Sequence, residues 1–198
     1  GGVCYFLWDR DNPGLCDVVN IRNNETMHSV RALNEFDTFI RHDQAASIVR
    51  KVCAFGEPMM SNMVSSRKPF GLPTVARPQE SGDILLRWQN GEGPYRRDEI
   101  IDKWKVITSY VGYDHAGNPG KDGKRRVFSK IDILPPGTIC TETYLVVGNF
   151  DTEQEAKKLV AYMKTLFFRF LVAQCMYSHH ITKEAYRLVP IQDFSLSW

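Results

Sequence analysis

The chain has 198 residues, of which 43% are hydrophobic and 24% are charged, and its formal net charge is +2 at pH 7. This composition excludes a disordered chain and supplies a core for one medium-sized domain or two small ones. The sequence has no apolar run of about 18 residues, so it predicts no transmembrane helix. Its first residues also lack the basic segment and cleavage pattern of a secretory signal peptide.

The first part of the sequence has mostly strand character. Residues 3–8 (VCYFLW) and 16–21 (CDVVNI) flank the turn tetrapeptide DNPG, which predicts a hairpin. Apolar residues recur at helical spacing between residues 45 and 55, which predicts one helix in this part. Further strands are expected at three apolar runs, residues 83–89, 104–112 and 143–150.

The strongest helix signal lies near the C-terminus. The capping-box pattern Thr152-x-x-Glu155 opens the run DTEQEAKKLVAYMKTLFFRFLVAQCMY, which keeps one apolar face over about seven turns. The second half of this run is apolar nearly all round, so the helix must be covered on most sides. A shorter helix is expected at 182–187, before a segment that Pro190 keeps extended.

These elements predict an α+β fold. We expect a mixed or antiparallel β-rich domain over residues 1–150, with the long helix and C-terminal extension of residues 151–198 packed on it. Because the sequence begins with Gly-Gly instead of Met and stops just after QDFSLSW, it is expected to be a fragment of a longer protein.

The cysteines predict no disulfide framework. Their number is odd, their spacing is wide and no CxxC pair occurs, which is typical of reduced thiols in a cytoplasmic protein. The five cysteines are Cys4, Cys16, Cys53, Cys140 and Cys175. Four of them lie in apolar sequence surroundings and are expected in the core.

Signals for catalysis are weak. Asp122-Gly-Lys124 and Glu155-Ala-Lys157 match the acid-x-Lys pair with which many nucleases hold a divalent metal beside a phosphate. The second pair begins at the helix-capping acid, and such short patterns are common. A Mg²⁺-dependent nuclease using Asp122 or Glu155 therefore stays an alternative, and the preferred expectation is a fragment without catalytic residues.

Cofactor and metal signals are also weak. The sequence contains no phosphate-binding GxxxxGK[ST] and no GxGxxG after a strand. Cys175, His179 and His180 lack a second pair at zinc-ligand spacing. We interpret Cys175 as a core residue and the two histidines as a polar helix end, and predict no cofactor or metal in this fragment.

The charge is unevenly distributed. Residues 67–130 hold 13 Lys and Arg against 8 Asp and Glu, a balance of +5, which leaves −3 for the rest. A basic middle favours an anionic partner, because cations in turns reach phosphates and Arg also contacts guanine edges. The alternative is an ordinary solvated face. The candidate DNA-binding residues are Ser65, Ser66, Arg67, Lys68, Arg96, Arg97, Lys103, Lys105, Lys121, Lys124, Arg125 and Arg126.

Three segments resemble, in the same order, the C-terminal part of bacterial restriction–modification proteins. They are GGVCYFLWDRD, SSRKPFG and the segment CTETYLVVGNFDTEQEAKKLVAYMKTLFFRFLV…YRLVPIQDFS. In that family an adenine-N6 DNA methyltransferase of the Asn-Pro-Pro-Tyr type precedes a target-recognition region. The resemblance implies a target-recognition domain that positions double-stranded DNA for a separate methyltransferase or endonuclease domain.

The same resemblance places the chemistry upstream in the parent chain. This sequence has no NPPY motif, so S-adenosylmethionine, and Mg²⁺ where the parent also cleaves DNA, would belong to the parent. Within SSRKPFG, Arg67 and Lys68 would meet phosphates or bases, and the two serines would donate to phosphate oxygens. In the alternative reading, Phe70 and Leu72 fill the core and leave the cations in water. A subunit-docking role for the long apolar helix is a further alternative.

Overall fold

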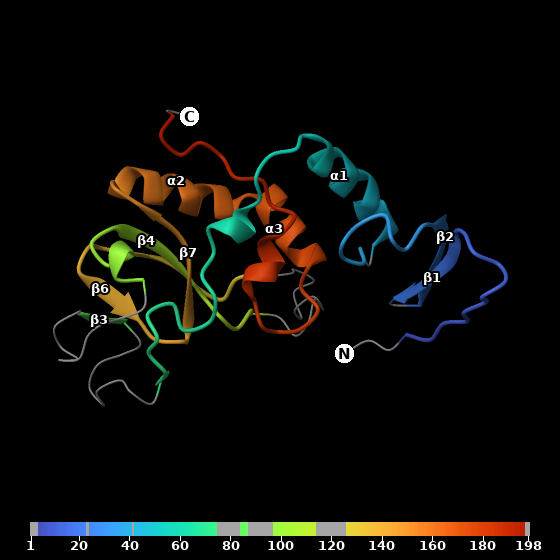
Figure 1. The fold of residues 1–198 in the computed structure, drawn as a ribbon, viewed down its shortest axis with the longest axis horizontal. Helices are drawn as coiled ribbons and strands as arrows, with labels where there is room; N and C mark the ends of the chain where they lie inside the picture. Colours follow the sequence, from blue (N-terminus) through green and yellow to red (C-terminus); the bar gives the residue numbers. More distant parts are fainter. Residues whose placement is uncertain are drawn as a thin grey trace. The chain divides into compact units, whose positions relative to one another are not determined.

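The structure is a computed structural model that describes residues 4–22, 24–40, 42–74, 84–86, 97–113 and 126–196. The chain divides into two compact units, Gly1–Gly56 and Glu57–Trp198 (Figure 1). Helices and antiparallel sheets are both present, so the predicted α+β class is confirmed. Among the helices in the described ranges, none has the length and apolarity needed to cross a bilayer.

The N-terminal unit contains a two-stranded hairpin. β1 (Cys16–Arg22) pairs with the antiparallel β2 (Glu25–Arg31) along its whole length. Asn24 in the connecting turn has φ = 64°, a left-handed conformation that asparagine tolerates better than most residues. The predicted strand at residues 16–21 is confirmed, but its partner follows it in the chain.

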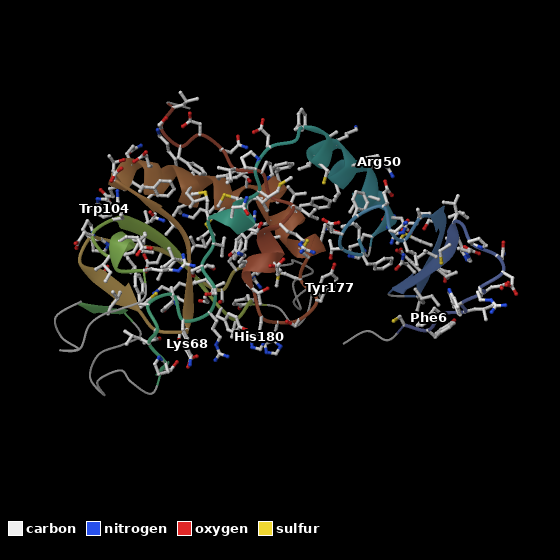
Figure 2. The ribbon with its side chains drawn as sticks, viewed as in Figure 1. Phe6, Arg50, Lys68, Trp104, Tyr177 and His180 are labelled. Atoms are coloured by element: carbon white, nitrogen blue, oxygen red, sulfur yellow. The ribbon has the colours of Figure 1, made fainter. Side chains whose placement is uncertain are left out.

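The predicted strand at residues 3–8 is wrong. Tyr5, Phe6, Leu7 and Trp8 lie outside any strand, and between 73% and 95% of each residue is exposed; Figure 2 labels Phe6. Strand composition forms a strand only when the backbone finds a partner. β1 pairs with β2, and the described residues 4–8 pair with neither strand, so no hairpin forms around DNPG.

The predicted helix at residues 45–55 corresponds to α1 (Asp43–Ala54). Its first residue, Asp43, connects the helix to both strands of the hairpin. One carboxylate oxygen of Asp43 accepts a hydrogen bond from the side-chain amide of Asn20 at 3.2 Å, and the other forms an ion pair with Nε of Arg31 at 3.3 Å. The hairpin and the helix are therefore held together by polar contacts of one carboxylate.

The C-terminal unit is built on a three-stranded antiparallel sheet in the order β5-β4-β7. Its central strand is β4 (Trp104–Ser109), flanked by β5 (Ile131–Leu134) and β7 (Tyr144–Phe150). A second, two-stranded sheet pairs β3 (Ile84–Leu86) with β6 (Thr138–Cys140). The three strand regions expected in this part of the sequence thus contain β3, β4 and β7.

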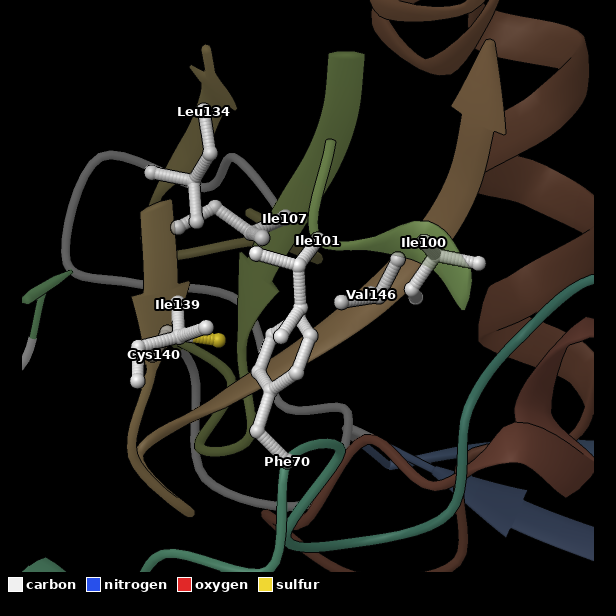
Figure 3. Close-up of a cluster of buried hydrophobic side chains, with 8 residues drawn as sticks. All are labelled: Phe70, Ile100, Ile101, Ile107, Leu134, Ile139, Cys140 and Val146. Carbon is white, nitrogen blue, oxygen red and sulfur yellow. The ribbon is translucent and has the colours of Figure 1, made fainter. Parts of the chain in front are cut away.

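Phe70 lies in a hydrophobic cluster of this unit (Figure 3). It is 1% exposed, although it belongs to the basic turn SSRKPFG, and Leu72 packs against the same cluster. The part of the alternative reading that places Phe70 in the core is confirmed, whereas Leu72 is partly buried against the cluster. The other members of the cluster come from β4 to β7 and from the segment around the short helix η4 (Asp98–Ile100): they are Ile100, Ile101, Ile107, Leu134, Ile139, Cys140 and Val146.

α2 (Glu153–Lys164) begins with the predicted capping box, which is confirmed. The Thr152 hydroxyl accepts a hydrogen bond from the Glu155 N–H at 3.3 Å, and the Glu155 carboxylate accepts one from the Thr152 N–H at 3.1 Å. The helix packs on β4, β5 and β7. Gly148 in β7 permits this close approach, because a Cβ atom there would lie 2.8 Å from Cδ2 of Leu159.

The prediction of a single long helix is wrong. Thr165 has an extended conformation (φ −66°, ψ 152°) that ends α2, and its hydroxyl accepts a hydrogen bond from the Phe168 N–H at 3.1 Å to begin α3 (Leu166–Gln174). A threonine that caps a new helix competes with continuation of the old one. The subunit-docking alternative thus loses the continuous apolar helix on which it depended.

Three short segments complete this unit. The helix expected at residues 182–187 is the single 3₁₀ turn η5 (Lys183–Tyr186), and a further 3₁₀ turn, η1, spans Met60–Asn62. Pro190 forms an isolated antiparallel bridge with Met59, in agreement with the expected extended segment.

The five cysteines all lie in the described residues, and none of them takes part in a disulfide. Only Cys140 and Cys175 are buried, whereas Cys4 and Cys53 are exposed. The expectation of four core cysteines was therefore too high, because apolar neighbours in sequence do not ensure burial where the segment itself lies at the surface.

Candidate nucleic-acid interface

The predicted DNA-binding residues fall into three groups. Ser66, Arg67, Lys68, Arg97, Lys103 and Arg126 lie on the surface to different extents. Two others, Ser65 and Lys105, are buried. The remaining four lie outside the described residues, as does Asp122 of the nuclease alternative: they are Arg96, Lys121, Lys124 and Arg125.

Ser65 serves the fold and not the surface. It is fully buried, its N–H donates to the carbonyl of Val146 at 2.8 Å, and its hydroxyl accepts from the Val146 N–H at 3.0 Å. These two bonds attach the start of the basic turn to β7. Ser65 is therefore not part of the candidate surface, whereas Ser66 beside it is exposed.

Lys105 is also not part of the candidate surface, because this residue of β4 is fully buried. Its ammonium donates to three main-chain carbonyls, those of Ile101 (2.6 Å), Lys103 (2.6 Å) and Pro135 (3.2 Å). Burial lowers the pKa of Lys105 to about 8, and nearby Cys140 and Asp102 oppose this shift. The ammonium is thus occupied by carbonyl oxygens inside the protein.

Lys103 lies at the far end of β4 from the basic turn. Its ammonium forms an ion pair with Asp151, next to the Trp104–Phe150 pair of the sheet. The opposite end of the strand is marked by Ser109, paired with Tyr144. With about 3.3 Å per strand residue, the two ends are roughly 20 Å apart. Lys103 therefore does not share a surface with the cations at the Ser109 end.

Arg67 and Lys68 lie at that Ser109 end and share one carboxylate. The Glu142 Oε2 atom is 3.0 Å from Arg67 Nη2 and 3.7 Å from Lys68 Nζ, and Glu142 Oε1 accepts a hydrogen bond from the Thr74 N–H at 3.2 Å. The Glu142 side chain is only 16% exposed, while those of Arg67 and Lys68 are 56% and 43% exposed. The acid holds the two cations in place and leaves both accessible.

Arg67 also begins a stack of planar groups. Its guanidinium carbon lies 5.1 Å from the ring centroid of Tyr110, and the Tyr110 ring stacks on His180 with centroids 4.7 Å apart and planes at 22°. The ring of His180 in turn lies 4.0 Å from that of His179. Lys68 and His180 are labelled in Figure 2 near the same edge of this unit.

The interpretation of the two histidines as a helix end is wrong. α3 stops at Gln174, and the loop after it pairs with the residues that follow β4. The Gly112 N–H donates to the His179 carbonyl at 2.7 Å, and the Ile181 N–H donates to the Tyr110 carbonyl at 2.8 Å. This main-chain pairing brings residues far apart in the sequence onto one surface.

The surroundings of His180 favour its neutral form. Partial burial lowers the pKa of His180 below its ordinary value of 6.5, and the nearby His179 and Arg67 lower it further. The His180 imidazole therefore contributes mainly a flat aromatic face beside the cation of Arg67.

Two further cations lie around the same end of β4. The Arg126 guanidinium is 4.9 Å from the Tyr113 ring centroid, and the Lys130 carbonyl accepts a hydrogen bond from the Ser109 N–H at 3.3 Å. The sequence did not single out Lys130, although it directly precedes a strand. We call the following four cations the basic end of the sheet: Arg67, Lys68, Arg126 and Lys130. Arg97 is exposed in the turn before η4 and is not part of this set.

The described part of the chain offers no metal site of three or more His, Cys, Asp or Glu side chains. Glu155 takes part in the capping box of α2. From the sequence, this role was the alternative to a nuclease role for Glu155. Cys175 is buried, as expected for a core residue.

Comparison with known proteins assigns no family to the chain. No protein-family model, no curated protein and no solved structure matches it. The features of the chain that bear on its function are the basic end of the sheet and the sequence resemblance.

Proposed function

We propose that this chain is a DNA target-recognition domain and that the basic end of the sheet contacts the phosphates of double-stranded DNA. One observation carries the proposal: cations and imidazoles from three segments far apart in the sequence, around residues 67, 128 and 180, lie at the same end of β4. At the other end, Lys103 is paired with Asp151.

The chemistry of this surface suits the backbone of DNA. Arg and Lys side chains supply most phosphate contacts in protein–DNA complexes, and they position the duplex without reading its sequence. Glu142 pairs with Arg67 and Lys68 at the surface, so its carboxylate competes with a phosphate for both cations. The role proposed is binding, and no catalytic step is assigned to this chain.

The resemblance to restriction–modification proteins supports the same proposal. In that context the chain would position DNA for a methyltransferase domain upstream in the same polypeptide, which would bind S-adenosylmethionine and act in the cytoplasm. Extrusion of the target base would take place in that domain.

The proposal is tested by fluorescence anisotropy of a labelled random-sequence duplex, titrated with the protein at several salt concentrations. Each neutralised phosphate contributes a slope of about −0.9 in a plot of log affinity against log salt, so binding is expected to weaken steeply between about 50 and 200 mM salt. Affinity that does not change with salt, or no binding at the lowest salt, would contradict the proposal.

Replacing Glu142 with glutamine is expected to tighten duplex binding by roughly two- to fivefold at low salt, because an exposed ion pair contributes up to about 1 kcal/mol. The variant removes the negative charge next to Arg67 and Lys68 but keeps an oxygen that accepts from the Thr74 N–H. Anisotropy gives the affinity, and the melting temperature reports on the fold. Weaker binding by a variant that melts like the native protein would place the DNA elsewhere.

A further inference from the structure

The stack at the basic end of the sheet ends in an exposed aromatic ring. It runs from the Arg67 guanidinium through Tyr110 to His180, and the His179 ring contacts that of His180 with the two planes tilted by 45°. His180 is half-buried, whereas His179 is exposed. The last planar group of the stack therefore faces solvent next to two cations.

Main-chain atoms attach the histidine-bearing loop to the sheet. The loop is attached to the end of β4 through main-chain atoms, with the His179 carbonyl accepting from Gly112 and the Ile181 N–H donating to Tyr110. The His179 and His180 backbones thus position the loop, and their rings extend a stack that the pairing itself does not use. Substitutions of the His179 ring are for this reason expected to leave the fold intact.

Positive charge is not the contribution of the His180 ring. The His180 pKa is lowered, first by burial and then by His179 and Arg67, which favours the neutral ring. The exposed ring is that of His179. An exposed aromatic ring beside exposed cations is the combination with which proteins bind unpaired nucleotides, because bases stack on aromatic faces while cations hold the phosphates.

We propose that the exposed His179 ring stacks on an unpaired nucleobase of a DNA strand, whose neighbouring phosphate is held by Arg67 and Lys68. This inference rests on the proposed function and adds a ligand class to the same surface: a single-stranded or locally opened segment. A free nucleotide offers the same base and phosphate chemistry, so the test has to separate the two sources.

The test compares two variants of one residue. His179→Phe keeps an aromatic ring without a titratable group, and His179→Lys keeps a cation without a ring. With a labelled single-stranded oligonucleotide of mixed sequence, we expect His179→Phe to bind like the native protein and His179→Lys to bind roughly five- to a hundredfold more weakly, the range reported by loss of one base–aromatic stack. Melting temperatures of both variants should match that of the native protein.

The contrary outcomes are equally distinct. If His179→Lys binds the strand more tightly than the native protein and His179→Phe binds more weakly, the contact is electrostatic and the stacking proposal is wrong. If neither variant changes single-strand binding, it is wrong as well. Competition by free adenosine monophosphate at the concentration of oligonucleotide nucleotides would assign the site to a free nucleotide and overturn the strand assignment.

A duplex arm separates this inference from the function on which it rests. Blunt duplex has few unpaired bases, so His179→Phe, which leaves Arg67 and Lys68 in place, is expected to bind it within about twofold of the native protein. His179→Lys adds a cation and is expected to bind duplex at least as tightly as the native protein while binding the single strand more weakly. Normal duplex binding with no effect on the single strand would reject the stacking site alone. Absence of duplex binding by the native protein would reject the proposed function.

Discussion

Replacing Phe70 with alanine is expected to lower the free energy of unfolding by about 3–5 kcal/mol, the usual cost of removing a buried phenylalanine ring. Phe70 is 1% exposed, and seven buried hydrophobic residues form its cluster. Urea unfolding followed by circular dichroism gives the value.

The matched control is Leu166→Ala in the same unit. Leu166 is 79% exposed, so its removal is expected to change the free energy of unfolding by no more than about 0.5 kcal/mol. A loss below about 1 kcal/mol for Phe70→Ala would contradict the position of Phe70 in the core. Loss of the Phe70 ring is also expected to loosen the basic turn. In that turn Lys68 adopts a left-handed conformation with φ = 59°.

The free energy of unfolding is expected to rise with pH above about 8, because of Lys105. Burial lowers its pKa from 10.5 to about 8 in the folded protein. Below this range both the folded and the unfolded chain hold the proton, and the cost of burying the ammonium is fully present. As the pH rises toward 10.5 the folded state releases the proton first, so the unfolded state binds more protons and stability increases. The full gain is about 3 kcal/mol at about 1.4 kcal/mol per pKa unit.

Lys105→Met isolates this contribution. The variant has no titratable group at this position, so the difference in stability between native protein and variant should shift by about 2 kcal/mol between pH 7 and pH 9.5. Two of the three carbonyls keep a donor without the lysine: the Gly137 N–H lies 3.0 Å from the Ile101 oxygen, and the Thr138 hydroxyl lies 2.6 Å from the Pro135 oxygen. Parallel pH profiles for the two proteins would mean that Lys105 has an ordinary pKa.

Local signals predicted much of the helical structure. The capping box at Thr152 and the apolar spacing of α1 involve residues within one or two turns of each other, and both are confirmed. The prediction of one continuous helix was wrong because the Thr165 hydroxyl accepts a hydrogen bond from the Phe168 N–H and begins a new helix. The continuous apolar run gave no sign of this break.

Strands were harder to predict, because pairing depends on distant segments. The apolar runs of β4 and β7 were recognised, whereas β5 and β6, with four and three residues, are too short for an alternation to be visible. β2 was missed because its sequence, ETMHSVR, is largely polar. The opposite error occurred at residues 3–8, where a strong strand composition lacks a partner.

The candidate surface was also predictable only where it depends on local sequence. The basic turn is visible in the sequence, so Arg67 and Lys68 were predicted as candidates. Their proximity to His179 and His180 depends on pairing between the end of β4 and the loop after α3, which no local pattern reveals. Ser65 and Lys105 have polar side chains that suggest exposure, but the fold uses their polar atoms for main-chain partners.

The central claim is that DNA binds at the basic end of the sheet, and two double variants of equal charge change test it most directly. Arg67→Ala/Lys68→Ala removes two cations from the surface, whereas Lys157→Ala/Lys164→Ala removes two exposed cations from α2, one of them paired with Glu153 at 2.9 Å. Duplex anisotropy is measured over a salt series for both. We expect the first variant to bind more weakly at low salt, with a log–log salt slope smaller by about 2, and the second variant to bind like the native protein. Equal losses in both variants, or a larger loss in the α2 variant, would show that overall charge or another surface binds the DNA.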